Sequence, residues 1–274
     1  MKKLLSALAL VLALSVPAFA APPFARMLGA NFVFRAQSDV GSTLCSATLF
    51  TKVERWVLTN YHCIEDSVQI VERDVVAPDG TVKKVRVVTY GEITLSQSAY
   101  SPDGKVGELT LRARILSFSR QTDLAVLQIL SETTELPFVA QLPPDSYTLR
   151  QGQTVYGVGN PLGLENSLSK GILAHLYREH RWDADQTAKY IQTDATQTGG
   201  SSGGALYDDD GMLIGVPSAG YRGVSINFAI PITEVKKFLR ANGFASAWDV
   251  SAPSRDEWIK ESERKAKEEQ NKRF

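Results

Sequence analysis

The segment Gly199-Gly200-Ser201-Ser202-Gly203-Gly204 leads directly into the apolar Ala205-Leu206-Tyr207. Glycines on both sides of a serine allow a tight turn that exposes one hydroxyl, since glycine adopts backbone angles that other residues avoid. A serine hydroxyl is a weak nucleophile unless a base lies beside it. An isolated run of this kind is more often a flexible Gly/Ser linker. The segment therefore predicts a nucleophile only if the chain also supplies a histidine and an acid.

The N-terminus is typical of a secretory signal peptide. Met1-Lys2-Lys3 is basic, Leu4 to Val16 is almost wholly apolar, and Pro17-Ala18-Phe19-Ala20 ends in small residues, so we expect residues 1–20 to be removed by cleavage after Ala20. The apolar run is shorter than the about 20 residues that a membrane-spanning helix needs, and no other segment of the sequence is longer. We therefore expect a periplasmic or secreted protein that is not attached to a membrane after cleavage.

Composition narrows the classes of partner. The 274 residues include 30 Lys+Arg and 30 Asp+Glu, and loss of Lys2 and Lys3 leaves the mature chain slightly negative. That balance favours neither nucleic acid nor an anionic membrane surface as a partner. The two cysteines, Cys45 and Cys63, favour one disulfide in an exported protein, whereas a cytosolic chain would keep two reduced, buried cysteines. We recognise no ligand spacing that predicts a metal, and we expect no cofactor.

Short strand-like runs between turn signals indicate an all-β fold. Examples rich in β-branched and aromatic residues are 46–50, 55–59, 82–90, 124–129 and 154–159. Such runs are typical of sandwiches and barrels. The proline-rich stretch 135–147 marks a boundary, so we place one half at 41–140 and the other at 148–241. Residues 21–40 are treated as a separate segment that packs on the body or on a neighbouring subunit, which leaves a homo-oligomer open.

Two helices are expected near the C-terminus. The first runs from Ile232 to about Ala241, because Val235, Phe238 and Leu239 share one face and Gly243 follows. The second lies in the charged tail 250–274, where Ser254 and Glu257 have the spacing of a capping box. Its apolar stripe is thin, so a solvated helix is favoured over a docking surface.

The chain supplies both partners that Ser202 requires. His62 ends the run 56–61 next to Cys63, where a base would be held rigidly within reach of a hydroxyl. Asp123 opens the apolar run 124–129, and a carboxylate at that place needs a partner because an isolated buried charge is costly. Asp66 is the rival acid, but it lies in a polar turn.

The order of these residues along the chain separates the known arrangements. An α/β-hydrolase places its histidine after the nucleophile, and no histidine follows Ser202. The subtilisin order needs an aspartate before His62, and only Asp39 stands there. His62, Asp123 and Ser202 follow the chymotrypsin order. This agreement makes the linker interpretation of the glycine-rich segment unfavourable.

Several motifs around these three residues resemble those of a known protein family. Thr59-Asn60-Tyr61-His62-Cys63 resembles the T-A-A-H-C segment of chymotrypsin-like serine proteases. Further stretches are similar to blocks of the HtrA (Deg) branch: Asp123-Leu124-Ala125-Val126-Leu127, Gly159-Asn160-Pro161-Leu162-Gly163, Ile191-Gln192-Thr193-Asp194-Ala195 and Asn227-Phe228-Ala229-Ile230-Pro231. The resemblance covers roughly residues 40 to 240, and the combination is far more specific than any single motif.

The resemblance implies two six-stranded antiparallel β-barrels with the site in the cleft between them. His62 and Asp123 would come from the first barrel and Ser202 from the second, with the backbone N–H groups of Gly200 and Ser202 forming an oxyanion hole. Cys45 stands where the disulfide partner of Cys63 would be. Thr196 would lie at the base of the primary specificity pocket, Ser218-Ala219-Gly220 would form its wall, and Ile226 would narrow it. Since no acid is among these, we expect a small or medium uncharged side chain rather than Arg or Lys.

Departures from the family pattern also carry expectations. Ser201 replaces the aspartate with which pancreatic-type members bind a freed N-terminus, so activation by cleavage is not expected. About 30 residues follow Ala241, too few for the PDZ domain that the HtrA branch usually adds. The sequence thus predicts an exported serine endopeptidase that cleaves polypeptides through an acyl-enzyme. The alternatives are an inactive relative that binds unfolded or partner polypeptides and, more weakly, an esterase.

Overall fold

The structure is a computed structural model that describes residues 23–38, 41–76, 80–179 and 189–271. The signal peptide expected over residues 1–20, with its cleavage after Ala20, lies outside them. None of the helices in the described part of the chain is long and apolar enough to cross a membrane.

The first half of the chain closes into a barrel of six strands in the order β1-β2-β3-β8-β7-β6. The strands are β1 (Asn31–Ser38), β2 (Gly41–Leu49), β3 (Trp56–Thr59), β6 (Glu92–Ser101), β7 (Gly104–Ser119) and β8 (Leu124–Ile129). Neighbouring strands are antiparallel. Residues 31–38 are therefore not a separate segment, as we expected of 21–40, because β1 pairs with both β2 and β6 and buries Phe32 and Phe34 in the barrel core.

The second half forms another closed barrel, in the order β10-β11-β14-β13-β12-β9. Its strands are β9 (Thr154–Gly159), β10 (Ser167–Glu179), β11 (Lys189–Thr193), β12 (Ala205–Tyr207), β13 (Leu213–Gly220) and β14 (Asn227–Pro231). Here too every neighbouring pair is antiparallel. The two six-stranded barrels that the resemblance implied are confirmed.

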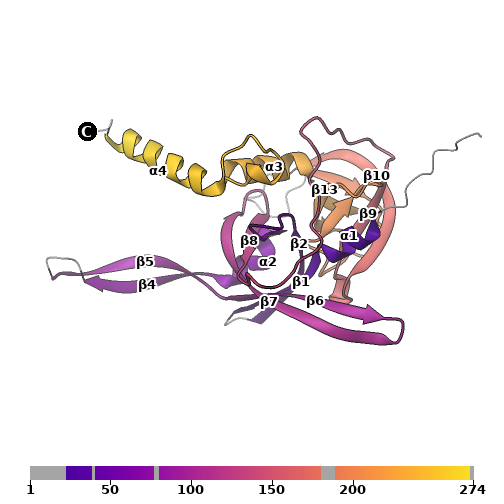
Figure 1. Ribbon diagram of the computed structural model, residues 1–274, viewed down its shortest axis with the longest axis horizontal. Helices are drawn as coiled ribbons and strands as arrows, with labels where there is room; N and C mark the ends of the chain where they lie inside the picture. The colour runs from indigo at the N-terminus through magenta and orange to yellow at the C-terminus, as the bar shows by residue number, and fades with distance from the viewer. Residues whose placement is uncertain (1–22, 39–40, 77–79, 180–188, 272–274) are drawn as a thin grey trace, which may run out of the picture.

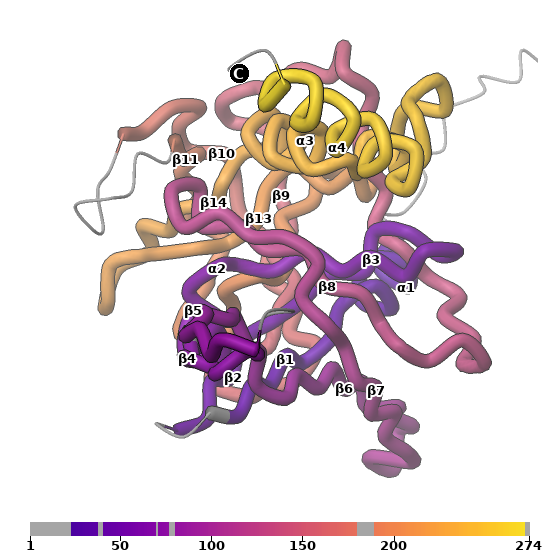
Figure 2. Tube along the Cα trace, turned by 90° about the vertical axis from the view of Figure 1, so that its left-hand side faces the viewer, coloured from indigo at the N-terminus to yellow at the C-terminus, as the bar shows by residue number. Residues whose placement is uncertain are grey.

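One hairpin lies outside both barrels. Strands β4 (Val68–Val76) and β5 (Val82–Tyr90) pair only with each other. Figure 1 shows this arm extending away from the body, and Figure 2 views the molecule from that side. Strand-like runs were expected here, but the sequence did not indicate that they leave the barrel.

A shared hydrophobic core joins the two barrels. Trp56 and Leu58 from the first barrel lie in the same buried cluster as Tyr156 and Val158 from the second. Helix α1 (Phe24–Gly29) adds to it, because Met27 is fully buried. Apolar packing thus holds the two barrels together, so that residues from their facing edges keep fixed positions relative to one another.

Helix α3 (Ile232–Ala241) has the bounds predicted from its apolar face. It ends before Gly243, whose φ of +80° is in the left-handed region that favours glycine. Helix α4 (Arg255–Asn271) occupies the charged tail, and its capping box forms: Ser254 N–H donates to Glu257 Oε2 at 2.9 Å. The remaining short helices are α2 (Tyr61–Ile64), η1 (Glu65–Ser67), η2 (Pro161–Gly163) and η3 (Ala245–Ala247).

Candidate active site

His62 and Asp123 meet at the edge of the first barrel. The imidazole Nδ1 lies 3.0 Å from both carboxylate oxygens of Asp123, and the backbone N–H of His62 donates to Oδ1 at 3.0 Å. The His62 side chain is 38% exposed and that of Asp123 only 2%. A carboxylate accepts hydrogen bonds, so this geometry places a proton on Nδ1 and leaves Nε2 able to accept one. The rival acid Asp66 has no such contact with His62 among the described residues.

Two further groups hold the Asp123 turn in place. Ser218 Oγ, from the second barrel, donates to Asp123 Oδ2 at 2.6 Å. Asn60 Nδ2 donates to the backbone oxygen of Asp123 at 2.9 Å. Asp123 adopts a φ of +53°, which is uncommon for a residue with a side chain. The buried contacts thus stabilise a backbone conformation that turns the carboxylate toward His62.

Tyr61 lies beside His62 in α2 and packs on Phe118, with 5.5 Å between the ring centroids. Burial, aided by the negative charge of Glu65, raises the pKa of the Tyr61 phenol. This side chain therefore stays neutral and adds no charge next to the imidazole.

Ser202 lies in the glycine-rich turn before β12. Its Oγ donates to the backbone oxygen of Ser218 at 3.3 Å, and within the described chain it makes no hydrogen bond with His62. Gly203, with a φ of +80°, could not be another residue, because a Cβ there would lie 2.2 Å from Thr59 Oγ1 and 2.3 Å from the oxygen of Ser46. The glycine therefore lets the serine turn pack against the first barrel at Thr59 and Ser46.

The N–H groups of Gly200 and Ser202 are among those of this turn that have no acceptor in the described part of the protein. The oxygen of Gly199 accepts from Leu162 N–H at 2.7 Å, which directs the Gly200 N–H to the opposite side of that peptide plane. Neither Gly200 N–H nor Ser202 N–H donates to any residue in the ranges that the structure describes. Unpaired donors beside a serine hydroxyl can stabilise negative charge on an oxygen placed there.

A buried polar network fixes the same turn from behind. Ser46 Oγ donates to the oxygen of Gly200 at 2.7 Å and accepts from Asn160 N–H at 2.8 Å, while Ser46 N–H donates to the oxygen of Ser202 at 2.8 Å. Ser46 and Asn160 are both completely buried. We call these contacts the Ser46 clamp. Sequence analysis identified Asn160 only as part of a motif and gave Ser46 no role. The residues next to each of them in the sequence do not indicate that it contacts the Ser202 turn.

The expected disulfide between Cys45 and Cys63 forms, with 18 residues of sequence separation. It ties the strand of Ser46 to the helix of His62. The His62 ring lies within 4.8 Å of both sulfur atoms, a grouping that might suggest a metal site. The sulfurs are bonded to each other, however, and only thiolates are effective ligands.

A cleft of about 780 Å³ runs from Ser202 along β13. Four of the five residues expected in the specificity pocket line it, namely Thr196, Ser218, Ala219 and Gly220. Ile226 does not, because its side chain packs against the core cluster instead. The loop after β13 supplies lining that the sequence did not indicate, including Tyr221 and Arg222. No carboxylate side chain is among the described residues that line this cleft.

Several known proteins are similar to this chain in sequence and in fold. The model of the trypsin-like peptidase domain matches residues 45–216. The chain is 39% identical over 141 residues to the chloroplastic Protease Do-like 5 of Arabidopsis thaliana, covering 48% of this chain and 43% of that protein. It is 35% identical over 137 residues to a probable periplasmic serine protease do/HhoA-like of Haemophilus influenzae, covering 47% of this chain and 28% of that protein. It thus spans less than half the length of these relatives.

Among solved structures, one described as an HtrA-type protease with tripeptide superimposes with a TM-score of 0.58. That match covers 80% of this chain and 62% of the other, at 24% sequence identity. At this identity the likeness concerns the fold.

Proposed function

Because this chain belongs to the trypsin-like peptidase domain family and is similar to HtrA-type proteases, we propose that it is a serine endopeptidase that acts through Ser202, His62 and Asp123. The observation that carries the proposal is the contact of His62 Nδ1 with both oxygens of the buried Asp123, at 3.0 Å each. A carboxylate in this position holds the imidazole in the orientation and tautomer that a general base needs.

The reaction follows from these positions. Ser202 Oγ attacks the peptide carbonyl carbon while His62 Nε2 takes its proton, and the carbonyl oxygen, now negative, accepts from the N–H groups of Gly200 and Ser202. His62 then returns the proton to the leaving amine, which gives an acyl-enzyme. Water attacks this ester with His62 again as the base, releasing the acid and restoring Ser202.

One adjustment precedes the first step. Ser202 Oγ donates a hydrogen bond to the backbone oxygen of Ser218, so the Ser202 side chain must rotate about χ1 before its hydroxyl can approach His62. Catalytic hydrogen bonds are often incomplete before substrate binds, and rotation between staggered positions is rapid. Substrate lying along β13 would favour this rotation, since an extended peptide backbone competes for the Ser218 oxygen.

The substrate class follows from the cleft. Its described lining has no carboxylate that would pair with Arg or Lys, and Thr196 and Ala219 are small. We propose polypeptide substrates with an uncharged side chain of small or medium size at the cleaved bond. A peptide-library cleavage profile tests this, and dominant cleavage after Arg or Lys would contradict it.

Export is part of the proposal. The signal-like residues 1–20, the Cys45–Cys63 disulfide and the periplasmic relative all support a periplasmic or secreted protein. Mass spectrometry of the exported chain should find Ala21 as the first residue.

Labelling with a fluorophosphonate probe tests the chemistry directly. Wild type should become covalently labelled, and Ser202→Ala should not, because the label requires the Ser202 hydroxyl. Peptide hydrolysis should fall about 10⁴-fold or more in Ser202→Ala and in His62→Ala. Ser201→Ala is the matched control, since the Ser201 hydroxyl is next to the nucleophile in sequence but is hydrogen-bonded only to Thr198 N–H among the described residues; this variant should remain labelled. A folded wild type that stays unlabelled would favour the alternative, an inactive relative that binds polypeptides.

A further inference from the structure

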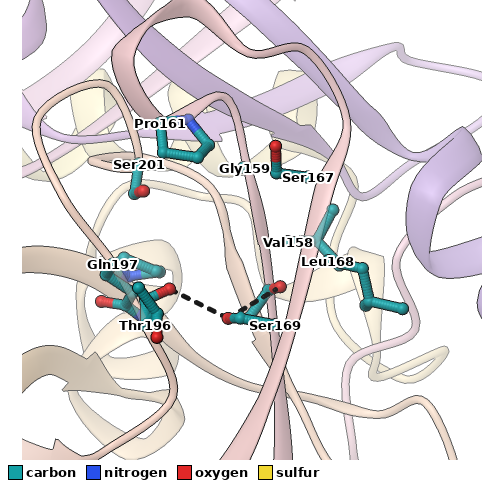
Figure 3. A pocket seen from close by; sticks show the side chains of 11 residues that line it. Val158, Gly159, Pro161, Ser167, Leu168, Ser169, Thr196, Gln197 and Ser201 are labelled. Carbon is teal, nitrogen blue, oxygen red and sulfur yellow. Dashed lines mark hydrogen bonds between the residues drawn. The ribbon is translucent and has the colours of Figure 1, made fainter. Parts of the chain in front are cut away.

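One charged side chain, Arg222, lines the cleft that runs from Ser202 along β13. We call this cleft of about 780 Å³ the Ser202 cleft, and Arg222 is the only charged residue among the described residues that line it. Figure 3 shows a smaller cavity, of about 330 Å³, that shares Thr196 and Ser201 with the cleft and has no charged side chain in its described lining. Of the two spaces, only the Ser202 cleft therefore presents a charge to a bound molecule.

The Arg222 guanidinium has no partner in the described part of the protein. It is exposed, and it makes no hydrogen bond or ion pair with any described residue. Other exposed arginines are paired: Arg240 lies 2.7 Å from a carboxylate oxygen of Asp145, and Arg264 lies 2.6 Å from one of Glu261. A carboxylate brought into the cleft would therefore not have to displace an internal acid from Arg222.

Packing fixes the turn that carries Arg222, which joins β13 to β14. Tyr221 N–H donates to the oxygen of Ile226 at 3.0 Å and closes the turn. The Tyr221 ring packs edge-on against the buried Phe228, with 5.9 Å between the ring centroids. Gly223 has a φ of +82°, in the left-handed region, which allows the chain to reverse there. Arg222 therefore projects from a defined place at the end of β13.

The edge of β13 beside this turn can accept an added strand. The neighbours of β13 are β14 and β12, but β12 pairs no further along β13 than Gly215. Residues 218–220 thus have β14 on one side and no described strand on the other. All strand pairs of this barrel are antiparallel, and an extended peptide added in the same sense runs from Arg222 toward Ser202.

This direction places Arg222 on the N-terminal side of the bond to be cleaved. The peptide residue opposite Ser218 directly precedes that bond, because the Ser218 oxygen accepts from Ser202 Oγ. The peptide residue opposite Gly220 is the third before the bond, since facing positions on two antiparallel strands advance together. Arg222 follows Gly220 by two positions, so the third and fourth residues before the bond come within reach of its long side chain.

We propose that Arg222 selects substrates with an acidic side chain at the third or fourth residue before the cleaved bond. The proposal rests on the proposed function and adds a charged determinant to the uncharged residue expected at the bond itself. A guanidinium donates two parallel hydrogen bonds to a carboxylate. Because no described residue that lines the cleft carries a carboxylate, an acidic side chain meets attraction there without repulsion.

Matched peptides with valine directly before the cleaved bond test this selection. Glutamate, or glutamine as its uncharged isostere, is placed in turn at the second, third and fourth residues before the bond and at the first and second after it. Wild type should show a kcat/KM about two- to fivefold higher with glutamate at the third or fourth residue only, as expected for an exposed ion pair. The ratio should fall toward one in 1 M NaCl, where the Debye length is about 3 Å. Equal values at every position, or a preference only after the bond, would overturn the proposal.

Substitutions of Arg222 assign the preference to this side chain. Arg222→Gln should abolish it, Arg222→Lys should retain part of it because the charge remains, and Arg222→Glu should instead favour lysine at the same position of the peptide. Arg73→Gln is the matched control, because Arg73 is an exposed arginine on the β4–β5 arm that does not line the cleft. That variant should keep the wild-type preference. An unaltered preference in Arg222→Gln would refute the role of Arg222.

Equilibrium binding separates this proposal from the proposed function. In Ser202→Ala, fluorescence anisotropy of the labelled peptides should give a Kd about two- to fivefold lower for glutamate than for glutamine at the same position, with no cleavage required. Equal Kd values would overturn the proposal. If wild type cleaves no peptide and takes no fluorophosphonate label while the binding preference holds, the proposed function fails and the acidic preference of the cleft stands. Absence of both cleavage and binding would overturn both.

Discussion

Replacing Ser46 with alanine should lower kcat about tenfold to a hundredfold and leave KM nearly unchanged. Ser46 is 0% exposed and does not line the Ser202 cleft, so the substitution removes no contact with substrate. It removes the donor to the Gly200 oxygen at 2.7 Å and the acceptor of Asn160 N–H at 2.8 Å. Loss of one oxyanion donor costs about 10² to 10³ in kcat, and loss of a residue that positions the donors should cost less.

The same change has a calculable effect on stability. Two groups, the partly buried Gly200 oxygen and the buried Asn160 N–H, lose the Ser46 hydroxyl, and a buried group left unpaired costs about 1 to 3 kcal/mol. Asn160 Nδ2 also loses the Ser46 hydroxyl, to which it donates at 3.0 Å, but it keeps the oxygen of Phe32 as an acceptor at 2.8 Å. We therefore expect the free energy of unfolding to fall by at least about 2 kcal/mol, or the melting temperature by about 4 to 8 °C.

Steady-state hydrolysis of a peptide substrate at 25 °C, well below unfolding, separates the two effects. Ser98→Ala is the matched control, because Ser98 is also buried in the first barrel but its hydroxyl has no partner among the described residues. That variant should keep wild-type kinetics. A folded Ser46→Ala with kcat within about twofold of wild type would refute the role of the Ser46 clamp.

Ser218→Ala should slow fluorophosphonate labelling of Ser202 about tenfold, because the Asp123 carboxylate loses a hydrogen bond of 2.6 Å; an unchanged labelling rate would show that the backbone N–H and ring of His62 hold the carboxylate unaided. Gly203→Ala should fail to fold or lose several kcal/mol of stability in denaturant titration, since its Cβ would meet Thr59 Oγ1 at 2.2 Å. Gly223→Ala, whose glycine has a φ of +82° and no atom within 4 Å of the added carbon, should lose only about 1 to 2 kcal/mol, and equal losses would disprove the clash. Replacing both Cys45 and Cys63 with alanine should destabilise the fold by about 3 kcal/mol in the same titration, as expected for opening a loop of 18 residues, and a smaller loss would indicate that local packing already restrains this loop.

Patterns that are local in the sequence predicted the fold well. The apolar faces of 124–129, 154–159 and 232–241 coincide with β8, β9 and α3, because burial and periodicity act within each segment. Strand β1 was not predicted, because its pairing with β2 and β6 arises only when the barrel closes and leaves no local sequence pattern. The β4–β5 arm has the composition of a barrel strand pair, and only topology reveals that it stands apart.

The site was predictable where chemistry restricts the residue type. A base, an acid and a nucleophile in one order along the chain left few choices, and the structure brings His62 and Asp123 together as expected. The Ser46 clamp was not predictable, because a serine 114 residues away from Asn160 becomes its partner only when the barrels pack. Ile226 was expected in the pocket from its position along the chain, whereas its partly buried side chain packs against the core cluster and does not line the cleft.

The division of the site between two separately closed barrels has a consequence for the newly made chain. Ser202 and the unpaired N–H groups belong to one barrel and His62 with Asp123 to the other, and contacts such as Ser218 Oγ to Asp123 Oδ2 exist only when the two are docked. A chain in which one barrel has formed and the other has not therefore lacks either the proposed nucleophile, Ser202, or its proposed base, His62. On the proposed function, a half-folded copy could not cleave a neighbouring chain, because its site would be incomplete until both barrels had docked.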